Sequence, residues 1–134
     1  MTVLYVDTSA LLKRVVVESE SAAVRRVLRE RFATGDLLTS SSLAWLEVWR
    51  AFRRAAVDDV PRAAGAALSG VAEFPLDDAG LERARRVGTN ELRALDAIHL
   101  AAAIAVGATE ILTYDRRMAE AAGALGLSVL APER

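Results

Sequence analysis

The chain has 134 residues, of which 53% are hydrophobic and 26% are charged, and its formal net charge is −1. This much apolar surface excludes a disordered chain, and the size suits one domain spanning residues 1–134. The absence of cysteine excludes disulfides, thiolate metal sites and cysteine nucleophiles, while the single histidine, His99, excludes sites that need two imidazoles.

The apolar and basic segments of the sequence indicate where the protein is located and what it can bind. The N-terminal run MTVLYVD has no cationic region and does not resemble a secretory signal. The longest uncharged run, AIHLAAAIAVGA, is too short to cross a bilayer, which takes about 20 residues. We therefore expect a soluble, cytoplasmic protein without membrane contact. Lys13 is the only lysine among 17 basic residues, so a general basic coat for nucleic acid is not expected, whereas local arginine patches are possible.

The first half of the chain alternates between strand and helix patterns. TVLYV (2–6) is short, β-branched and aromatic, as in a strand that is buried on both faces. Thr8 or Ser9 is predicted to cap a helix in the following SALLKRVVV. The later elements of this half are a helix at 19–35, a strand at 36–40 and an amphipathic helix at 42–57.

The second half continues the alternation. A helix of small residues is predicted to begin at Pro61. The remaining elements are helices at 77–87, 93–108 and 115–126, with strands at 110–115 and 128–132. Short strands separated by helices are typical of a small α/β sandwich with a mostly parallel sheet, although the order of the strands cannot be deduced from the pattern.

Two aspartates follow apolar strands directly. Asp7 comes after TVLYV, and Asp115 comes after EILTY. In open parallel sheets the carboxyl ends of the strands form the ligand crevice, so these two carboxylates are candidates for one shared site. The alternative is that each is an ordinary turn or capping residue, and Asp115 in particular could cap the helix that follows it.

Two further acids lie within apolar helical stripes. Glu47 has Leu43, Ala44 and Ala51 as its neighbours on the helix, which predicts a partly buried carboxylate that needs a partner or a metal. The alternative for Glu47 is a weak surface ion pair with Arg50 or Arg54.

Asp96 is the second of these acids. It has Leu92 and Leu100 one turn away on either side, and its alternative role is the N-cap of a helix at 97–106. His99 lies one turn further on, close enough to interact with Asp96, and is expected to be a core or supporting residue rather than a metal ligand.

If the four acids lie close together in the fold, one explanation accounts for all of them. Four converging carboxylates would repel one another and lose hydration, a conflict that a hard divalent cation such as Mg²⁺ or Mn²⁺ resolves. Such a site suits phosphodiester hydrolysis. Thr8, Ser9 and Thr113 are the hydroxyl residues placed to orient the carboxylates or a bound water.

Four segments spread over nearly the whole chain resemble the PIN-domain ribonucleases, and specifically the VapC toxins of bacterial toxin–antitoxin pairs. The segments are VDTSALLKR, SSLAWLEVWRAFRR, LRALDAIHLAAA and TYDRRMAEAAGALGLSVLAP. The resemblance implies a three-layer α/β/α sandwich and an endoribonuclease that depends on Mg²⁺ or Mn²⁺.

The resemblance also implies roles for individual residues. Asp7 matches the first-strand aspartate of the family, Glu47 its helical glutamate, and Asp96 the acid that opens the LDAIHLA helix. Asp115 matches the acid of the Thr-x-Asp element, whose role varies more within such proteins. Asp7 and Asp96 are therefore the residues most expected to contact the metal.

Partners are implied in the same way: RNA as substrate, a homodimer, and a small antitoxin that wraps the toxin in a hetero-oligomer and blocks its site. Trp45, Trp49 and Phe52 share a helical stripe with Ala56 and could line a groove for a partner, although such a stripe more often belongs to the core. Arginines are expected on one rim of the acidic pocket to contact phosphate. The candidate basic residues are Lys13, Arg14, Arg50, Arg53, Arg54, Arg93, Arg116 and Arg117.

Two other functions are compatible with parts of the sequence. A phosphoryl-transfer domain with Asp7 as phospho-acceptor is disfavoured because the only lysine is early in the chain and Ser9 stands where a dehalogenase-type phosphatase would need a second aspartate. An inactive module that only binds RNA or an antitoxin would have no need for four acids in apolar surroundings. The sequence does not specify which RNA is cut or whether one or two metals bind.

Overall fold

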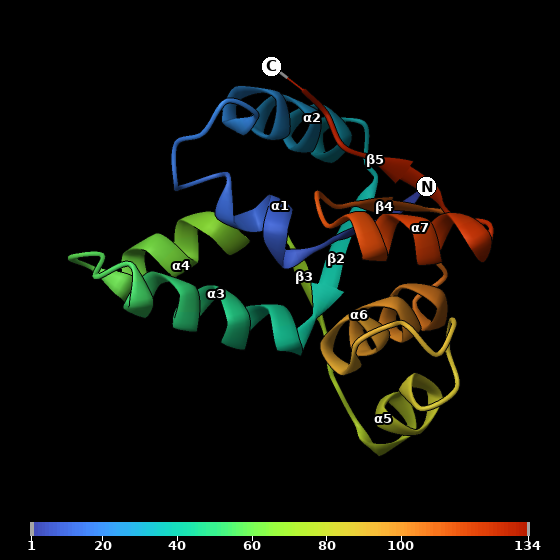
Figure 1. The fold of residues 1–134 in the computed structure, drawn as a ribbon. Coiled ribbons are helices and arrows are strands. Elements are labelled where there is room, and N and C mark those ends of the chain that lie inside the picture. Colours follow the sequence, from blue (N-terminus) through green and yellow to red (C-terminus); the bar gives the residue numbers. More distant parts are fainter. Residues whose placement is uncertain (1, 134) are drawn as a thin grey trace.

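A computed structural model describes residues 2–133 and contains a five-stranded sheet in the order β3-β2-β1-β4-β5. All four strand pairs are parallel (Figure 1), so the prediction of a mostly parallel α/β sheet is confirmed. The strands are β1 (Val3–Val6), β2 (Leu37–Ser41), β3 (Ala72–Phe74), β4 (Glu110–Leu112) and β5 (Ser128–Leu130).

Helices cover both faces of this sheet, which gives the three layers that the resemblance implies (Figure 1). One face carries α1 (Thr8–Leu12), α2 (Ser21–Ala33), α3 (Ser42–Arg54) and α4 (Val60–Leu68). The other face carries α6 (Ala94–Ala105) and α7 (Arg116–Ala124), and α5 (Asp78–Ala84) packs on α6.

The central strand β1 explains why its sequence shows no polar alternation. Leu4 and Val6 pack in the cluster formed by α1 to α4, while Tyr5 points to the opposite face and packs with α6 and α7. All three side chains are fully buried. Because both faces of a parallel sheet are covered, alternate residues of a central strand enter two different cores.

The strand predicted at 110–115 ends at Leu112, and the largest differences from prediction concern β3 and α1. The strand β3 was not predicted, since Ala72 and Glu73 are exposed and the segment has no apolar pattern; it is an edge strand defined by its pairing with β2. The helix α1 is five residues long and ends at Leu12, well short of the predicted 9–17. The run of three β-branched valines that follows Arg14 favours other backbone conformations over a helix.

Other helix ends are set by backbone conformation. The helix predicted at 42–57 ends at Arg54, because Ala56 adopts a left-handed φ of 54°. The helix predicted from Pro61 begins at Val60, where the side chain of Asp59 accepts a hydrogen bond from the backbone N–H of Arg62. Within residues 2–133, no helix combines the length and the hydropathy that crossing a membrane requires.

An ion pair ties the helix α2 to the sheet. The guanidinium of Arg31 donates two hydrogen bonds to the carboxylate of Glu110, with N–O distances of 2.5 and 2.7 Å, and a third to Asp36 at 3.3 Å. The hydrogen bonds and charge of Arg31 lower the pKa of Glu110, outweighing a partial burial that acts in the opposite direction.

Replacing Glu110 by glutamine is therefore expected to lower the free energy of unfolding by about 1 kcal/mol at pH 7, a value reduced for the partial exposure of the pair. Since the folded-state pKa of Glu110 lies below its unfolded value, its contribution is fully present above about pH 5 and is lost as the pH falls through the folded value. Urea unfolding of both proteins between pH 3 and 7 measures this. A difference in stability that does not shrink at low pH would contradict the assignment.

Candidate active site

Asp7 lies at the carboxyl end of the central strand and is buried, with 6% of its surface exposed. It is the N-cap residue of α1, but its side chain does not cap the helix. Instead Oδ2 accepts hydrogen bonds from Oγ of Ser9 at 2.9 Å and from Oγ1 of Thr113 at 2.8 Å. The prediction that Thr8 or Ser9 caps this helix is wrong, because both hydroxyls bind carboxylates of the site.

Glu47 extends from α3 toward the same place. Its Oε1 accepts a hydrogen bond from Oγ1 of Thr8 at 2.7 Å and lies 2.5 Å from Nε2 of His99. The alternative of an ion pair with Arg50 or Arg54 is therefore wrong, since the carboxylate is paired on its inner side. Burial alone raises the pKa of Glu47, but the hydrogen bond and charge of His99 and the bond from Thr8 together lower it.

His99 is almost fully buried in α6 beside these acids. Burial lowers its pKa, but the hydrogen bond to Glu47 and the negative charges of Asp7, Glu47 and Asp96 outweigh burial, so the net pKa is raised. Its Nε2 lies 3.8 Å from Oδ1 of Asp7. His99 is therefore a buried residue that binds the carboxylate of Glu47, which fits the expectation of a core or supporting residue.

Asp96 is in the first turn of α6, and the N-cap is Arg93 rather than Asp96. The alternative in which Asp96 caps a helix at 97–106 is therefore wrong, because the helix begins at Ala94. Burial raises the pKa of Asp96, and the charges of Asp115, Asp7 and Glu47 raise it further, against an opposing effect of His99. The negative charges of the other three acids therefore act together on the carboxyl group of Asp96.

Asp115 follows β4 and caps α7 by accepting a hydrogen bond at Oδ1 from the backbone N–H of Met118, at 3.0 Å. Its own backbone N–H donates to Oγ1 of Thr113 at 3.1 Å. The capping role considered for Asp115 is thus present, together with a place beside the other acids.

Three of the four acids line one cavity of about 600 Å³, namely Glu47, Asp96 and Asp115. Asp7 is not among the lining residues, but its charge acts on Asp96. The ends of β1 and β4 meet here, on either side of the point where the strand order reverses, and open α/β sheets bind ligands at such a point.

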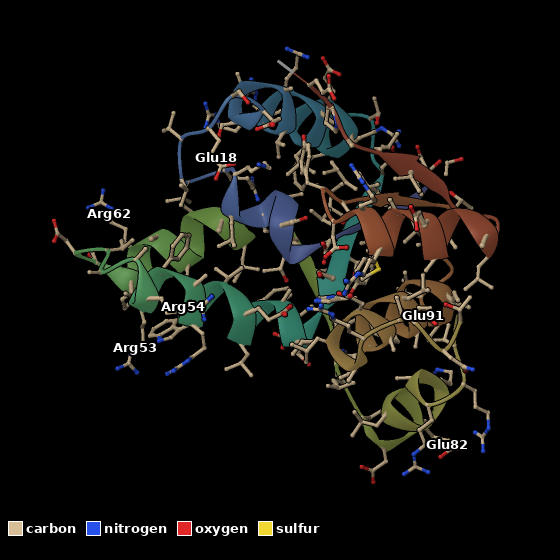
Figure 2. The ribbon with its side chains drawn as sticks, viewed as in Figure 1. Glu18, Arg53, Arg54, Arg62, Glu82 and Glu91 are labelled. Atoms are coloured by element: carbon tan, nitrogen blue, oxygen red, sulfur yellow. The ribbon has the colours of Figure 1, made fainter. Side chains whose placement is uncertain are left out.

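Arginines occupy part of the rim, as expected, and they are Arg93, Arg116 and Arg117. Other candidates lie elsewhere: Lys13 pairs with Glu18 and Glu20, and Arg14 donates to the backbone oxygens of Ala67 and Ser69. Arg53 and Arg54 extend from the end of α3 that is remote from the site (Figure 2). The arginines that line this cavity are therefore the N-cap residue of α6 and the first two residues of α7.

The donor set fits a hard divalent cation. The acids and the hydroxyls of Thr8, Ser9 and Thr113 offer oxygen atoms only, which Mg²⁺ and Mn²⁺ prefer. The raised pKa of Asp96 reflects burial first and, in addition, the negative charges of Asp115, Asp7 and Glu47, which a cation would offset. Between Thr2 and Glu133, no three acidic or histidine side chains lie close enough to form a ready-made metal site, so binding would draw the carboxylates closer.

Tyr5 is the supporting residue that the sequence did not reveal. Its hydroxyl oxygen lies 2.6 Å from Nδ1 of His99 and accepts a hydrogen bond from the backbone N–H of Ser41 at 2.9 Å. The sequence feature that indicates this role is that Tyr5 is the one residue in VLYV with a polar atom on its side chain.

The model of the PIN domain family matches residues 4–124, which include all four acids. The chain belongs to the PIN domain family. It is 40% identical over 134 residues to Ribonuclease VapC46 of Mycobacterium tuberculosis, a match that covers 98% of this chain and 99% of the relative. It is 38% identical over 133 residues to Ribonuclease VapC35 of the same species, with 96% of each chain covered. The protein is therefore a VapC-type PIN domain.

Solved structures share this PIN fold at lower sequence identity. The VapBC2 structure from Rickettsia felis, bound to a DNA fragment from its promoter, contains a chain that matches with a TM-score of 0.72 and 12% identity over 96% of this chain and 98% of that one. The toxin VapC20 of Mycobacterium tuberculosis, which cleaves the sarcin–ricin loop, matches with a TM-score of 0.71 and 20% identity over 96% and 99%. These similarities support the three-layer fold.

Proposed function

We propose that this protein is a toxin of a toxin–antitoxin pair that acts as an endoribonuclease dependent on Mg²⁺ or Mn²⁺ in the cytoplasm. The observation that carries the proposal is the meeting of Asp7, Glu47, Asp96 and Asp115, from four separate segments, at one edge of the sheet. The relatives named VapC ribonucleases support the same activity.

The metal would be held by Asp7 and Asp96, with Glu47 and Asp115 completing the set. The hydroxyls of Ser9 and Thr113 both donate to Oδ2 of Asp7. The other oxygen, Oδ1, is the one nearer His99 and takes part in neither of these bonds. When bound, the metal would supply an activated water and would stabilise the charge on the attacked phosphate. The hydroxyls of Ser9 and Thr113 fix the orientation of Asp7, which reduces the reorganisation that binding requires.

The substrate would approach along the arginine rim. Arg93, Arg116 and Arg117 line the cavity that the acids also line, and guanidinium groups bind phosphate through paired hydrogen bonds. A phosphodiester chain would thus be held by cations on the rim while its scissile phosphate lies over the carboxylates. The four acids alone would repel RNA, so we infer that the arginines and the metal together make the site accessible to it.

The experiment that tests this function is cleavage of total cellular RNA by the purified, antitoxin-free protein with Mg²⁺, with Mn²⁺ and with EDTA, beside an Asp7→Asn variant. We expect discrete fragments with either metal, and none with EDTA or with the variant. The fragments would also identify the RNA that is cut. A folded wild-type protein that cleaves no RNA with either metal would contradict the proposal and would favour a binding module.

The antitoxin would bind over α3 and α4. Trp45, Leu46 and Trp49 line a hollow of about 420 Å³ with residues of α4. Trp45 packs partly against the core, whereas 41% of Trp49 is exposed, so the expectation that the whole stripe belongs to the core is wrong for Trp49. An exposed apolar hollow suits an apolar segment of a partner, and two of the solved structures with this fold are toxin–antitoxin complexes. We also propose that two copies of this chain form a homodimer within the complex with the antitoxin.

Replacing Trp49 by glutamate is expected to weaken binding of the cognate antitoxin about tenfold or more, because tryptophans at the centre of an interface often contribute over 2 kcal/mol. Cleavage of free RNA should not change, since the hollow is separate from the acid-lined cavity. Calorimetric titration of toxin with antitoxin measures the first effect. Unchanged affinity would place the antitoxin on another surface.

A further inference from the structure

A chain of hydrogen bonds joins Tyr5, His99 and Glu47, and its Tyr5–His99 bond is fully buried. The hydroxyl oxygen of Tyr5 is 2.6 Å from Nδ1 of His99, and Nε2 of His99 is 2.5 Å from Oε1 of Glu47. Tyr5 is fully buried and His99 is 2% exposed. Nothing in the proposed chemistry requires a tyrosine or a histidine at these positions.

The chain connects three elements that are distant in the sequence. Tyr5 belongs to β1, His99 to α6 and Glu47 to α3. The hydroxyl of Tyr5 also accepts the backbone N–H of Ser41, the N-cap residue of α3, at 2.9 Å. One tyrosine therefore holds the start of the helix that carries Glu47 and the imidazole that contacts its carboxylate.

Glu47 needs such a restraint. Its side chain is long and 26% exposed, and it is the only candidate ligand that comes from the middle of a helix. Repulsion from the neighbouring acids favours rotamers that turn the carboxylate toward solvent, where Arg50 lies one turn away on the same helix. The bonds from His99 and Thr8 both go to Oε1 and hold the carboxylate on its inner side, and neither involves Oε2.

The restraint does not depend on the charge of the imidazole. A carboxylate can only accept, so Nε2 carries the proton in the bond to Glu47 in the neutral as well as the charged ring. The tyrosine hydroxyl can donate to a bare Nδ1 or accept from a protonated one, so this bond also persists in both states.

We propose that His99, held in place by Tyr5, is a positioning residue that fixes Glu47 for metal binding and thereby for RNA cleavage. This inference rests on the proposed function. The effect would pass through Glu47, since His99 is too deeply buried to reach RNA. Supporting partners of this kind typically change metal affinity or activity by about 10- to 100-fold.

The test uses the purified protein and three substitutions: His99→Leu, which removes both bonds, Tyr5→Phe, which removes only the hydroxyl, and His99→Gln, which can still donate to Glu47. Mn²⁺ affinity is measured by calorimetry without RNA, and cleavage is measured on the RNA that the wild type cuts fastest. For His99→Leu we expect Mn²⁺ affinity and kcat to fall by about 10-fold or more, with KM for RNA unchanged. Tyr5→Phe should lower Mn²⁺ affinity and kcat by less than His99→Leu does. His99→Gln should retain part of the Mn²⁺ affinity and kcat that His99→Leu loses.

Two comparisons separate positioning from general stability. In a Glu47→Gln background, His99→Leu should cause no further loss of Mn²⁺ affinity, because the residue through which it acts has lost its charge. Thr39→Val removes another hydrogen bond of a buried side chain, from Oγ1 of Thr39 to the backbone oxygen of Ala72 at 2.8 Å, and should leave both Mn²⁺ affinity and kcat unchanged. Thermal unfolding establishes that each variant is folded.

The outcomes distinguish this inference from the function on which it rests. Suppose that the wild type binds Mn²⁺ and cleaves RNA, and that all three variants equal it in Mn²⁺ affinity and kcat. The positioning role is then overturned and the proposed function stands. A full additional loss in the Glu47→Gln background also overturns it. If the wild type neither binds Mn²⁺ nor cleaves RNA, the proposed function fails and the inference fails with it.

Discussion

Replacing Asp96 by asparagine is expected to reduce RNA cleavage about a thousandfold while raising the stability of the metal-free protein. The loss of activity follows because Asp96 is one of the two residues assigned to the metal, whose charge stabilisation of several kcal/mol corresponds to about three powers of ten in rate. The gain in stability follows because burial and the charges of Asp115, Asp7 and Glu47 raise the pKa of Asp96. An acid whose pKa is raised by folding destabilises the folded state when it is ionised.

The pH dependence of this gain has a definite sign. The destabilisation by Asp96 is fully present above its folded-state pKa and disappears as the pH falls below its unfolded value of about 3.9. The variant should therefore exceed the wild type in melting temperature at pH 7 with EDTA, and the difference should shrink toward pH 3. Excess Mg²⁺ should reverse the order by stabilising only the wild type.

The matched control for Asp96 is Glu91→Gln. Glu91 is an exposed acid in the segment before α6 and does not line the cavity that Asp96 lines. Its replacement should alter neither cleavage nor melting temperature. If Asp96→Asn retained cleavage, the metal assignment would be wrong, and if it melted at a lower temperature in EDTA, the acids would not be repelling one another.

Replacing Phe52 by alanine is expected to lower the free energy of unfolding by about 3–5 kcal/mol, which is a large share of the 5–15 kcal/mol typical of folded domains. Phe52 is fully buried, in the cluster that also contains Leu11 of α1 and Ala64 of α4. Its removal would leave a cavity between helices that pack directly on one another. Denaturant unfolding monitored by circular dichroism measures the loss.

The control for Phe52 lies on the same helix. Leu46 is 59% exposed, so Leu46→Ala should change stability by about 0.5 kcal/mol or less. Comparable losses for the two variants would mean that α3 contributes through its own helical stability rather than through packing. In that case the apolar stripe of α3 would not be the feature that fixes its position.

The sequence alone determined the class of fold and singled out the four candidate acids. The apolar residues at 4–6 and 111–112 are explained by burial on both faces of a sheet, and this apolar character can be seen without coordinates. The four acids were equally visible, because a carboxylate at the end of an apolar strand or within an apolar helical stripe is costly to bury unless it has a partner. That cost depends on the neighbours along the chain, which the sequence displays directly.

Only the tertiary structure decided which groups support the acids and which surfaces are free. Tyr5 and His99 are 94 positions apart, and His99 and Glu47 are 52 apart, so no local pattern predicts their hydrogen bonds. The same holds for the edge strand β3, which is defined by pairing with β2, and for Trp49, which shares a helical stripe with Phe52 but extends beyond the core. Periodicity records which face of an element is apolar, whereas the partner of each side chain depends on how distant elements pack.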